Sequence, residues 1–151
     1  MHIALRRAEV LMSRELLNRP RRRASDGREL FGNFTPASST MEGPRASDGF
    51  AALRFFDRAE NGGNENLLID AGDVIFAPLL LWVDRNHDGV SQSPELQTLS
   101  DAGVISIGLD PKEARRQDEF GNWFRYRSPA LVESRGKIEK VFAYDVYLAS
   151  R

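Results

Sequence analysis

The chain has 151 residues, of which 41% are apolar, and a formal net charge of −1. This length and composition provide one domain with a substantial core and hardly two. Cysteine is absent, which excludes disulfides and thiolate metal sites. The longest apolar run, residues 74–83, is far shorter than the roughly 20 residues that cross a bilayer, so we expect no membrane insertion.

Residues 1–24 form a basic N-terminal segment. Val10, Leu11 and Leu17 have the spacing of an amphipathic helix, and three arginines follow at positions 21–23. No aromatic residue interleaves with those arginines, so we expect a flexible tail and no nucleic-acid contact. The segment shows no export signal, because it lacks an uninterrupted apolar stretch and a small-residue cleavage site.

Residues 25–49 are rich in Ser, Thr, Pro and Gly, which predicts a loop or linker. We expect the folded domain over residues 50–151. It begins with a helical pattern in which Phe50, Leu53 and Phe56 share one face.

Residues 57–73 have the ligand types of an EF-hand calcium loop, whose oxygens stand at positions 1, 3, 5, 7, 9 and 12. Asp57 takes the first position across five extra residues, and Leu67 stands where the turning glycine belongs. A side chain with a β carbon resists the positive φ of that turn. A weak site and a structural relic therefore both remain open. The expected ligands are Asp57, Asn64, Asn66, Leu68 through its carbonyl, Asp70 and Asp73.

The next segment is expected to start as a helix at Asp73, with Ile75 and Phe76 facing the core. Pro78 limits that helix, because proline lacks an amide hydrogen and clashes with the preceding turn. Residues 80–83 then enter the second loop in extended form.

Residues 84–95 match the EF-hand calcium loop closely, with Gly89 at the turning position. The alternative is a surface turn rich in Asp, Asn and Gly, and the eighth position holds Ser91 instead of an aliphatic residue. Because this loop has normal length, we expect it to bind Ca²⁺ more tightly than residues 57–73. Its expected ligands are Asp84, Asn86, Asp88, Val90 through its carbonyl, Gln92, and Glu95 as the bidentate ligand.

Ser93 and Pro94 predict the start of a short helix over residues 94–102, stopped by Gly103. Beyond it, apolar residues alternate over 104–109, 123–127 and 141–148, which predicts strands joined by turns near 121–122 and 135–136. The expected fold class is therefore α+β, with EF-hand-like helix and loop units packed on a small C-terminal antiparallel sheet.

Catalysis has little support in the sequence. The carboxylate pairs Glu113 with Asp118 and Asp110 with Glu119 are conceivable acid–base groups of a hydrolase. Nucleophile and phosphate-loop motifs are missing. We therefore expect a protein that is not an enzyme.

The runs at 50–53, 56–64, 81–91, 95–99 and 121–127 resemble bacterial EF-hand domain-containing proteins with dockerin-like calcium loops. That resemblance implies a calcium-binding module, secreted or at the cell surface and often part of a longer extracellular chain. The sequence before Gly27 lacks the acidic loop that precedes the matching stretch in that family, and with the missing export signal this indicates a truncated or frameshifted reading. Two functions stay open beside catalysis: a module stabilised by Ca²⁺, and a dockerin-type module that binds a protein partner.

Overall fold

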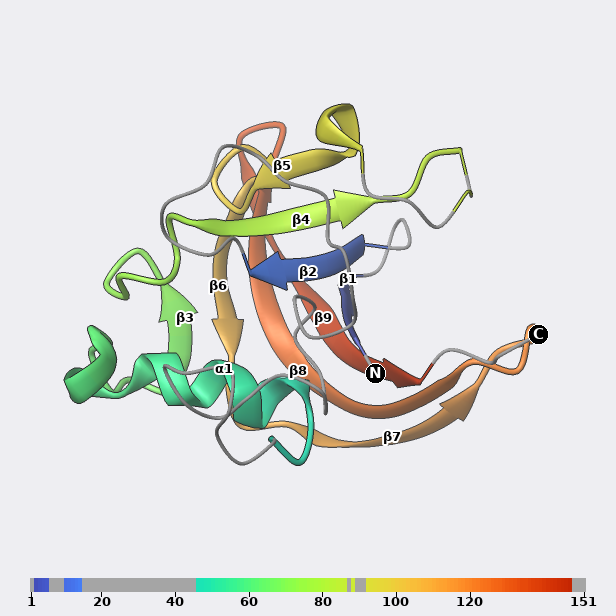
Figure 1. The fold of residues 1–151 in the computed structure, drawn as a ribbon, viewed down its shortest axis with the longest axis horizontal. Coiled ribbons are helices and arrows are strands. Elements are labelled where there is room, and N and C mark those ends of the chain that lie inside the picture. Colours follow the sequence, from blue (N-terminus) through green and yellow to red (C-terminus); the bar gives the residue numbers. More distant parts are fainter. Residues whose placement is uncertain (1, 6–9, 15–45, 87, 89–91, 148–151) are drawn as a thin grey trace.

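The computed structural model describes residues 46–86, 88 and 92–147, together with the backbone of residues 2–5 and 10–14. These residues form a mostly β structure, with one α-helix and a single sheet of nine strands (Figure 1). All strand pairs are antiparallel. The expected α+β fold with EF-hand-like units is therefore wrong, because this part of the chain contains no helix–loop–helix unit.

The sheet brings together segments that are far apart in the sequence. Its order is β3-β6-β8-β9-β1-β2-β4-β5, with β7 also paired to β8. The strands are β1 (His2–Leu5), β2 (Val10–Arg14), β3 (Leu68–Asp70), β4 (Leu79–Val83), β5 (Leu96–Thr98), β6 (Val104–Gly108), β7 (Lys112–Gln117), β8 (Trp123–Ser134) and β9 (Lys137–Tyr147).

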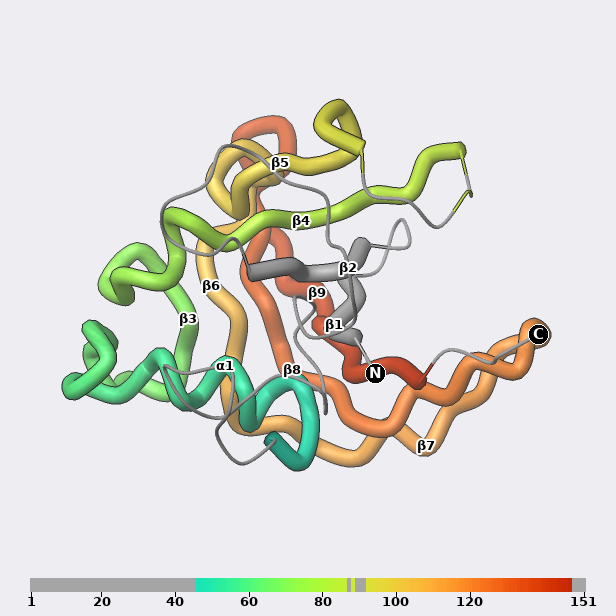
Figure 2. The backbone as a smooth tube through the Cα atoms, viewed as in Figure 1, coloured from blue at the N-terminus to red at the C-terminus, as the bar shows by residue number. Residues whose placement is uncertain are grey.

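Strands β8 and β9 form a long hairpin that carries the rest of the sheet. Along one edge, β8 pairs with β7 over residues 123–127 and with β6 over residues 130–132. Where β7, β8 and β9 run together, they extend away from the rest of the molecule (Figure 2). We call this three-stranded extension, residues 112–127 with 142–147, the arm.

The helix α1 (Gly49–Asp57) begins at a side-chain cap. Asp48 Oδ1 accepts a hydrogen bond from the Ala51 backbone N–H (2.8 Å), which satisfies one of the amide groups that a helix leaves free at its start. The expected apolar face is buried, with Phe50 and Leu53 fully inaccessible. The prediction of this helix is confirmed.

The core joins α1 to β3, β4 and β6. Full burial of one large apolar side chain contributes about 1.5–3 kcal/mol, so apolar contacts hold together the elements that flank both predicted loops. The large apolar side chains that are fully buried are Phe50, Leu53, Ile69, Leu79, Leu99, Ile107 and Leu109.

Two further expected helices are wrong. Residues 71–78 form turns, although Ile75 and Phe76 are buried as expected. The segment after Gln92 is a single 3-10 turn, η2 (Ser93–Glu95), followed at once by β5. Pairing of β5 with β4 satisfies the backbone groups of this segment, and that pairing decides for a strand.

The prediction of a helix in the N-terminal segment is wrong, whereas the predictions for the C-terminal strands are confirmed. Val10 and Leu11 belong to β2, which pairs with β4, so an amphipathic helix at these positions is wrong. Leu17, the arginines at 21–23 and residues 25–45 lie outside the described residues. The predicted C-terminal strands are confirmed in β6, β8 and β9, with positive φ at the turn residues Gly121 and Gly136. None of the helices in the described ranges is long and apolar enough to span a bilayer.

Candidate functional site

The carboxylate of Asp57 holds the first predicted loop, residues 57–73. Asp57 is the last residue of α1 and is only 3% exposed. Its Oδ1 accepts a hydrogen bond from the Asn66 backbone N–H (3.1 Å), and its Oδ2 accepts one from the Leu67 N–H (3.0 Å). Both oxygens therefore fasten the loop backbone to the end of the helix.

The expected third, fifth and ninth positions of this loop meet at Asp70. Asn66 Nδ2 donates to Asp70 Oδ2 (2.9 Å), and Asn64 Nδ2 lies 3.5 Å from Asp70 Oδ1. A Cβ added at Gly72 would stand 2.3 Å from Asn64 Nδ2. The glycine therefore leaves the space in which these polar side chains gather.

Asp73, at the expected twelfth position, is buried and ties the loop at two points. Its Oδ1 accepts a hydrogen bond from the Asn64 N–H (3.2 Å), and its Oδ2 accepts one from the Asp70 N–H (2.8 Å). Burial raises the pKa of Asp73; the two hydrogen bonds oppose that rise, and the negative charges of Asp70 and Asp57 add to it. A cation bound among these carboxylates would remove their mutual repulsion.

Leu67 adopts the positive φ that the sequence disfavours, at 61°. A residue with a β carbon pays about 1–2 kcal/mol in this region. Hydrogen bonds at both ends of the residue offset that cost: Leu67 donates to Asp57 Oδ2, and its carbonyl accepts from the Leu109 N–H (2.9 Å). Leu68, whose carbonyl was the expected seventh ligand, lies in β3 opposite Gly108.

The second predicted loop, residues 84–95, follows β4. Asp84 comes directly after the strand and is half-buried. Asp88 Oδ2 accepts hydrogen bonds from Asn86 Nδ2 and from Gln92 Nε2, both at 2.9 Å. The expected third, fifth and ninth positions therefore meet in this loop as well. The expected seventh ligand, Val90, lies outside the described residues.

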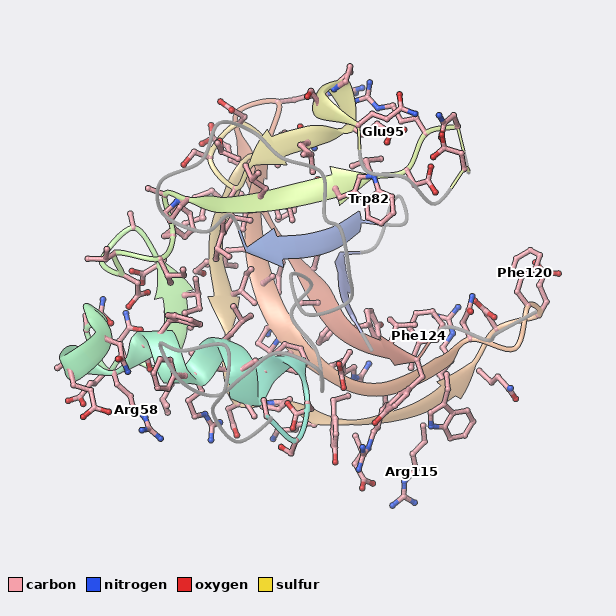
Figure 3. The ribbon with its side chains drawn as sticks, viewed as in Figure 1. Arg58, Trp82, Glu95, Arg115, Phe120 and Phe124 are labelled. Atoms are coloured by element: carbon pink, nitrogen blue, oxygen red, sulfur yellow. The ribbon has the colours of Figure 1, made fainter. Side chains whose placement is uncertain are left out.

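Glu95, at the expected twelfth position, is buried and accepts three hydrogen bonds. Its Oε1 takes the Arg85 N–H (3.0 Å), while its Oε2 takes the Gln92 N–H (3.2 Å) and the indole N–H of Trp82 (3.1 Å; Figure 3). Burial raises the pKa of Glu95, but these hydrogen bonds outweigh it and hold the pKa below its ordinary value. The carboxylate is therefore held in its charged form at neutral pH.

Trp82 is a site residue that ligand spacing does not predict. The sequence signal is an aromatic residue within the apolar run before Asp84, and such a residue is normally assigned to a core. Trp82 is indeed buried. Only the pairing of β4 with β5, which sets Trp82 opposite Leu96, brings its N–H to the carboxylate of Glu95, the residue before Leu96.

The two loops lie on opposite sides of the molecule, as shown by the positions of Arg58 and Glu95 in Figure 3. Strand β3 in the first loop pairs with β6. Within the described ranges no three Asp, Glu or His side chains come close enough to hold a metal by themselves. An ion at either loop would therefore also need amide and backbone carbonyl oxygens, as calcium loops allow.

The fold and both loops can now be set beside known proteins. The family model of the SPM domain matches residues 20–149. The chain belongs to the SPM domain family. It is also 39% identical, over 97 residues, to the iron-regulated protein FrpA of Neisseria meningitidis serogroup C. That match covers 64% of the chain but only 8% of FrpA, so the chain spans a small part of its relative's length.

The expected membership in an EF-hand, dockerin-like family is therefore wrong for this SPM domain. The resemblance rested on ligand spacing. A twelve-residue segment that wraps a hard cation needs alternate oxygens and a sharp turn, and these needs do not depend on the elements that flank the loop. Similar spacing therefore does not establish a common fold.

The two acid pairs considered for hydrolysis take structural or exposed positions in the SPM domain. Glu113 forms an ion pair with Arg115 (2.5 Å). The Asp118 carboxylate accepts hydrogen bonds from Phe120 and Asn122; burial raises the pKa of Asp118, but these bonds outweigh it and lower the pKa. Asp110, Glu113 and Glu119 are exposed.

The SPM domain also buries an acid that the sequence pattern did not single out. Asp145 in β9 is fully buried; its Oδ1 lies 3.4 Å from the Gly49 N–H, and its Oδ2 has no hydrogen-bond partner in the described structure. Burial, and then the negative charge of Asp48, raise the pKa of Asp145 to about 7. Alternation predicted the strand, but not which polar residue of it would face the core.

Proposed function

We propose that this SPM domain is a calcium-binding module, with one ion in loop 84–95 and a second, weaker site in loop 57–73. One observation carries the proposal: the expected ligands converge in both loops, on Asp70 at position 9 in the first and on Asp88 at position 5 in the second. In each, the residues at positions 3, 5 and 9 meet at one carboxylate, and the position-12 carboxylate accepts the position-9 N–H.

The donor set favours calcium over other ions. Carboxylate, amide and carbonyl oxygens suit a hard cation, and calcium accepts six to eight of them in flexible geometry. Magnesium requires a tight octahedron and sheds its water reluctantly. The amide groups of Asn86 and Gln92 now donate to Asp88, and rotation of each amide would present its oxygen in place of its nitrogen.

Glu95 retains the capacity to act as a ligand. A carboxylate can coordinate calcium through one or both of its oxygens, and Oε1 lies at the loop backbone, where it accepts the Arg85 N–H. The bonds from Trp82, Arg85 and Gln92 also orient the group before any ion arrives. A preoriented ligand loses little side-chain entropy on binding.

The role we propose for the ion is structural. Calcium would fasten residues on both sides of each loop and so add to the stability of the folded state. We further propose that the module acts, without catalysis, within a longer secreted or cell-surface protein. Extracellular calcium modules work at dissociation constants of about 10⁻⁴–10⁻³ M, a range that suits loops with few carboxylates.

Calcium titration of the purified chain tests the proposal. At a hundredfold excess over the dissociation constant, calcium should raise the free energy of unfolding by about 2.7 kcal/mol, and magnesium by much less. Glu95→Gln should lower the affinity measured by calorimetry steeply, whereas Glu139→Gln, on the exposed part of β9, should leave it unchanged. An unchanged melting curve in calcium of about 0.1 M, a hundredfold above the upper end of that range of dissociation constants, or equal binding by Glu95→Gln, would refute it.

A further inference from the structure

One face of the arm carries a row of aromatic rings with an arginine at each end. The Phe124 and Tyr144 rings lie edge to face at 5.5 Å, and Phe142 follows at 6.3 Å from Tyr144. Arg116 stands 5.1 Å from the Phe124 ring, and Arg127 stands 4.8 Å from the Phe142 ring. The row thus crosses β7, β8 and β9.

Strand register places these residues on one side of the arm. The bulge between Phe124 and Tyr126 turns Phe124 to the same side of the sheet as Arg127. Their partners on β9, Val146 and Tyr144, lie on that side as well. Arg116 pairs with Phe124, and Lys112 pairs with Arg127. We call this surface the arginine face: Lys112, Arg116, Phe124, Arg127 and Phe142.

The cations of the arginine face are exposed and form no ion pair within the described residues, and Asp118 is close enough to Arg116 to interact with its charge. Lys112, Arg116 and Arg127 are all exposed. Ion pairs in the described part of the chain join Arg58 to Glu60 and Arg115 to Glu113, and none involves these three cations. Stacking against aromatic rings orders the arginine side chains, yet leaves the edges of their guanidinium groups free to donate hydrogen bonds.

We propose that the arginine face binds an acidic polypeptide segment in extended conformation. An extended chain with acids at alternate positions presents its carboxylates on one side. Guanidinium groups bind carboxylates through two parallel hydrogen bonds, and part of the ordering cost is already met by the stacking. This proposal is independent of calcium binding.

Charge and ring geometry favour a polypeptide over a nucleic acid. Single-stranded nucleic acids bind through bases that stack on open aromatic faces, but Arg116 and Arg127 already cover the rings at the two ends of the row. Residues 31–110 hold twelve acids against four arginines, and this negative charge repels a long polyanion. A short acidic segment can contact the arm alone and so avoids this repulsion.

Fluorescence anisotropy with a labelled peptide of alternating Glu and Thr tests this proposal, at low salt and without divalent ions. The double variant Arg116→Gln with Arg127→Gln should weaken binding at least about tenfold. A Gln and Thr peptide of equal length should not bind. Two-dimensional NMR should show the arginine Nε–H signals of Arg116 and Arg127 shifting as the acidic peptide is added.

Two matched variants test whether the effect belongs to this face. Arg125 lies on the same strand but contacts Tyr126 and Tyr147, on the opposite side of the arm. Arg58, near Phe55 and paired with Glu60, lies on the far side of the molecule. Arg125→Gln and Arg58→Gln should each keep peptide affinity within about twofold of the parent.

Three results would overturn the proposal. One is a failure of the acidic peptide to bind at millimolar concentration. Another is an equal loss in either matched variant, since that would mean diffuse attraction. The third is tighter binding of a thymidine oligonucleotide with the same dependence on Arg116 and Arg127. Melting curves of the double variant establish that it is folded, so that a loss of binding is not a loss of structure.

Discussion

The predicted calcium loop that matches the EF-hand pattern better has the more exposed acids, and the loop that matches it worse has the more deeply buried ones. Loop 84–95 keeps the normal length and the turning glycine, yet its described acids include the exposed Asp88 and the half-buried Asp84. Loop 57–73 is longer and lacks that glycine, yet the acids at both of its ends, Asp57 and Asp73, are each 3% exposed and bonded to its backbone.

This difference shows that a good match to the ligand pattern and a well-assembled loop have separate physical causes. A ligand pattern records which oxygens are available, whereas hydrogen bonds from loop N–H groups to buried carboxylates decide how far a loop is assembled without an ion. Loop 57–73 begins at the end of α1 and therefore has a rigid anchor. We expect it to be the more stable loop without calcium, and loop 84–95 to bind calcium more tightly.

The largest change in the free energy of unfolding with pH is expected from Asp145, and it must be separated from the contribution of the loop carboxylates. Its pKa rises from 3.8 to about 7 on folding, so the folded state keeps a proton that the unfolded chain has lost. The free energy of unfolding should therefore fall as pH rises from about 4 to about 7, by about 4 kcal/mol at most. Denaturant melts at several pH values measure this slope.

Asp145→Asn serves as the control for that measurement. The amide cannot ionise, so its stability should vary much less over the same pH range, and the remaining slope reports the loop carboxylates. If the parent and Asp145→Asn have the same slope, burial of Asp145 is not the cause.

Gly63→Ala should break the first loop and leave the second intact. A Cβ at Gly63 would stand 2.1 Å from the Asp57 carbonyl, which forces the end of α1 to move at a cost of about 3 kcal/mol. Gly136→Ala is the control, because its φ is 72° but nothing lies within 4 Å of the added carbon. That change should cost only about 1 kcal/mol, and equal losses in urea melts would contradict the packing explanation.

Asp57→Ala should mainly lower the stability without calcium, whereas Asp84→Ala should mainly lower the calcium affinity. Without calcium, Asp57→Ala should lower the free energy of unfolding by about 2 kcal/mol, because the N–H groups of Asn66 and Leu67 lose their acceptors. Asp84→Ala should change this stability little but abolish the tighter calcium-binding event. Calorimetric titration of both variants measures the second effect, and equal losses of calcium affinity would mean that the loops bind as one coupled site.

The smallest effect is expected for Leu67→Gly, which should stabilise the protein by about 1 kcal/mol or less. Glycine accepts the φ of 61° without the β-carbon clash, although its greater freedom in the unfolded chain reduces the gain. The Leu67 side chain is 51% exposed, so little apolar burial is lost. A decrease in melting temperature would mean that Leu67 is not strained.

Local patterns predicted the elements whose signals lie within the element itself. Helix α1 has its cap and apolar face within ten residues, and β6, β8 and β9 show alternation bounded by turn glycines. The predicted helices that start at Asp73, that span 94–102 and that carry Val10 and Leu11 are wrong. Pairing with distant strands decides the last two: β5 and β2 both complete their hydrogen bonds on β4, and helix propensity is too weak to compete with such pairing.

The sequence by itself determined the candidate ligands, because metal chemistry demands particular side chains at particular spacings. Only the tertiary structure decided which acids are anchored or buried. Asp57 and Asp73 acquire their partners when loop 57–73 folds back on α1, Glu95 acquires Trp82 through the pairing of β4 with β5, and Asp145 is buried where β9 passes the start of α1. Exposure and hydrogen bonding depend on residues remote in the chain, and no pattern of neighbours encodes them.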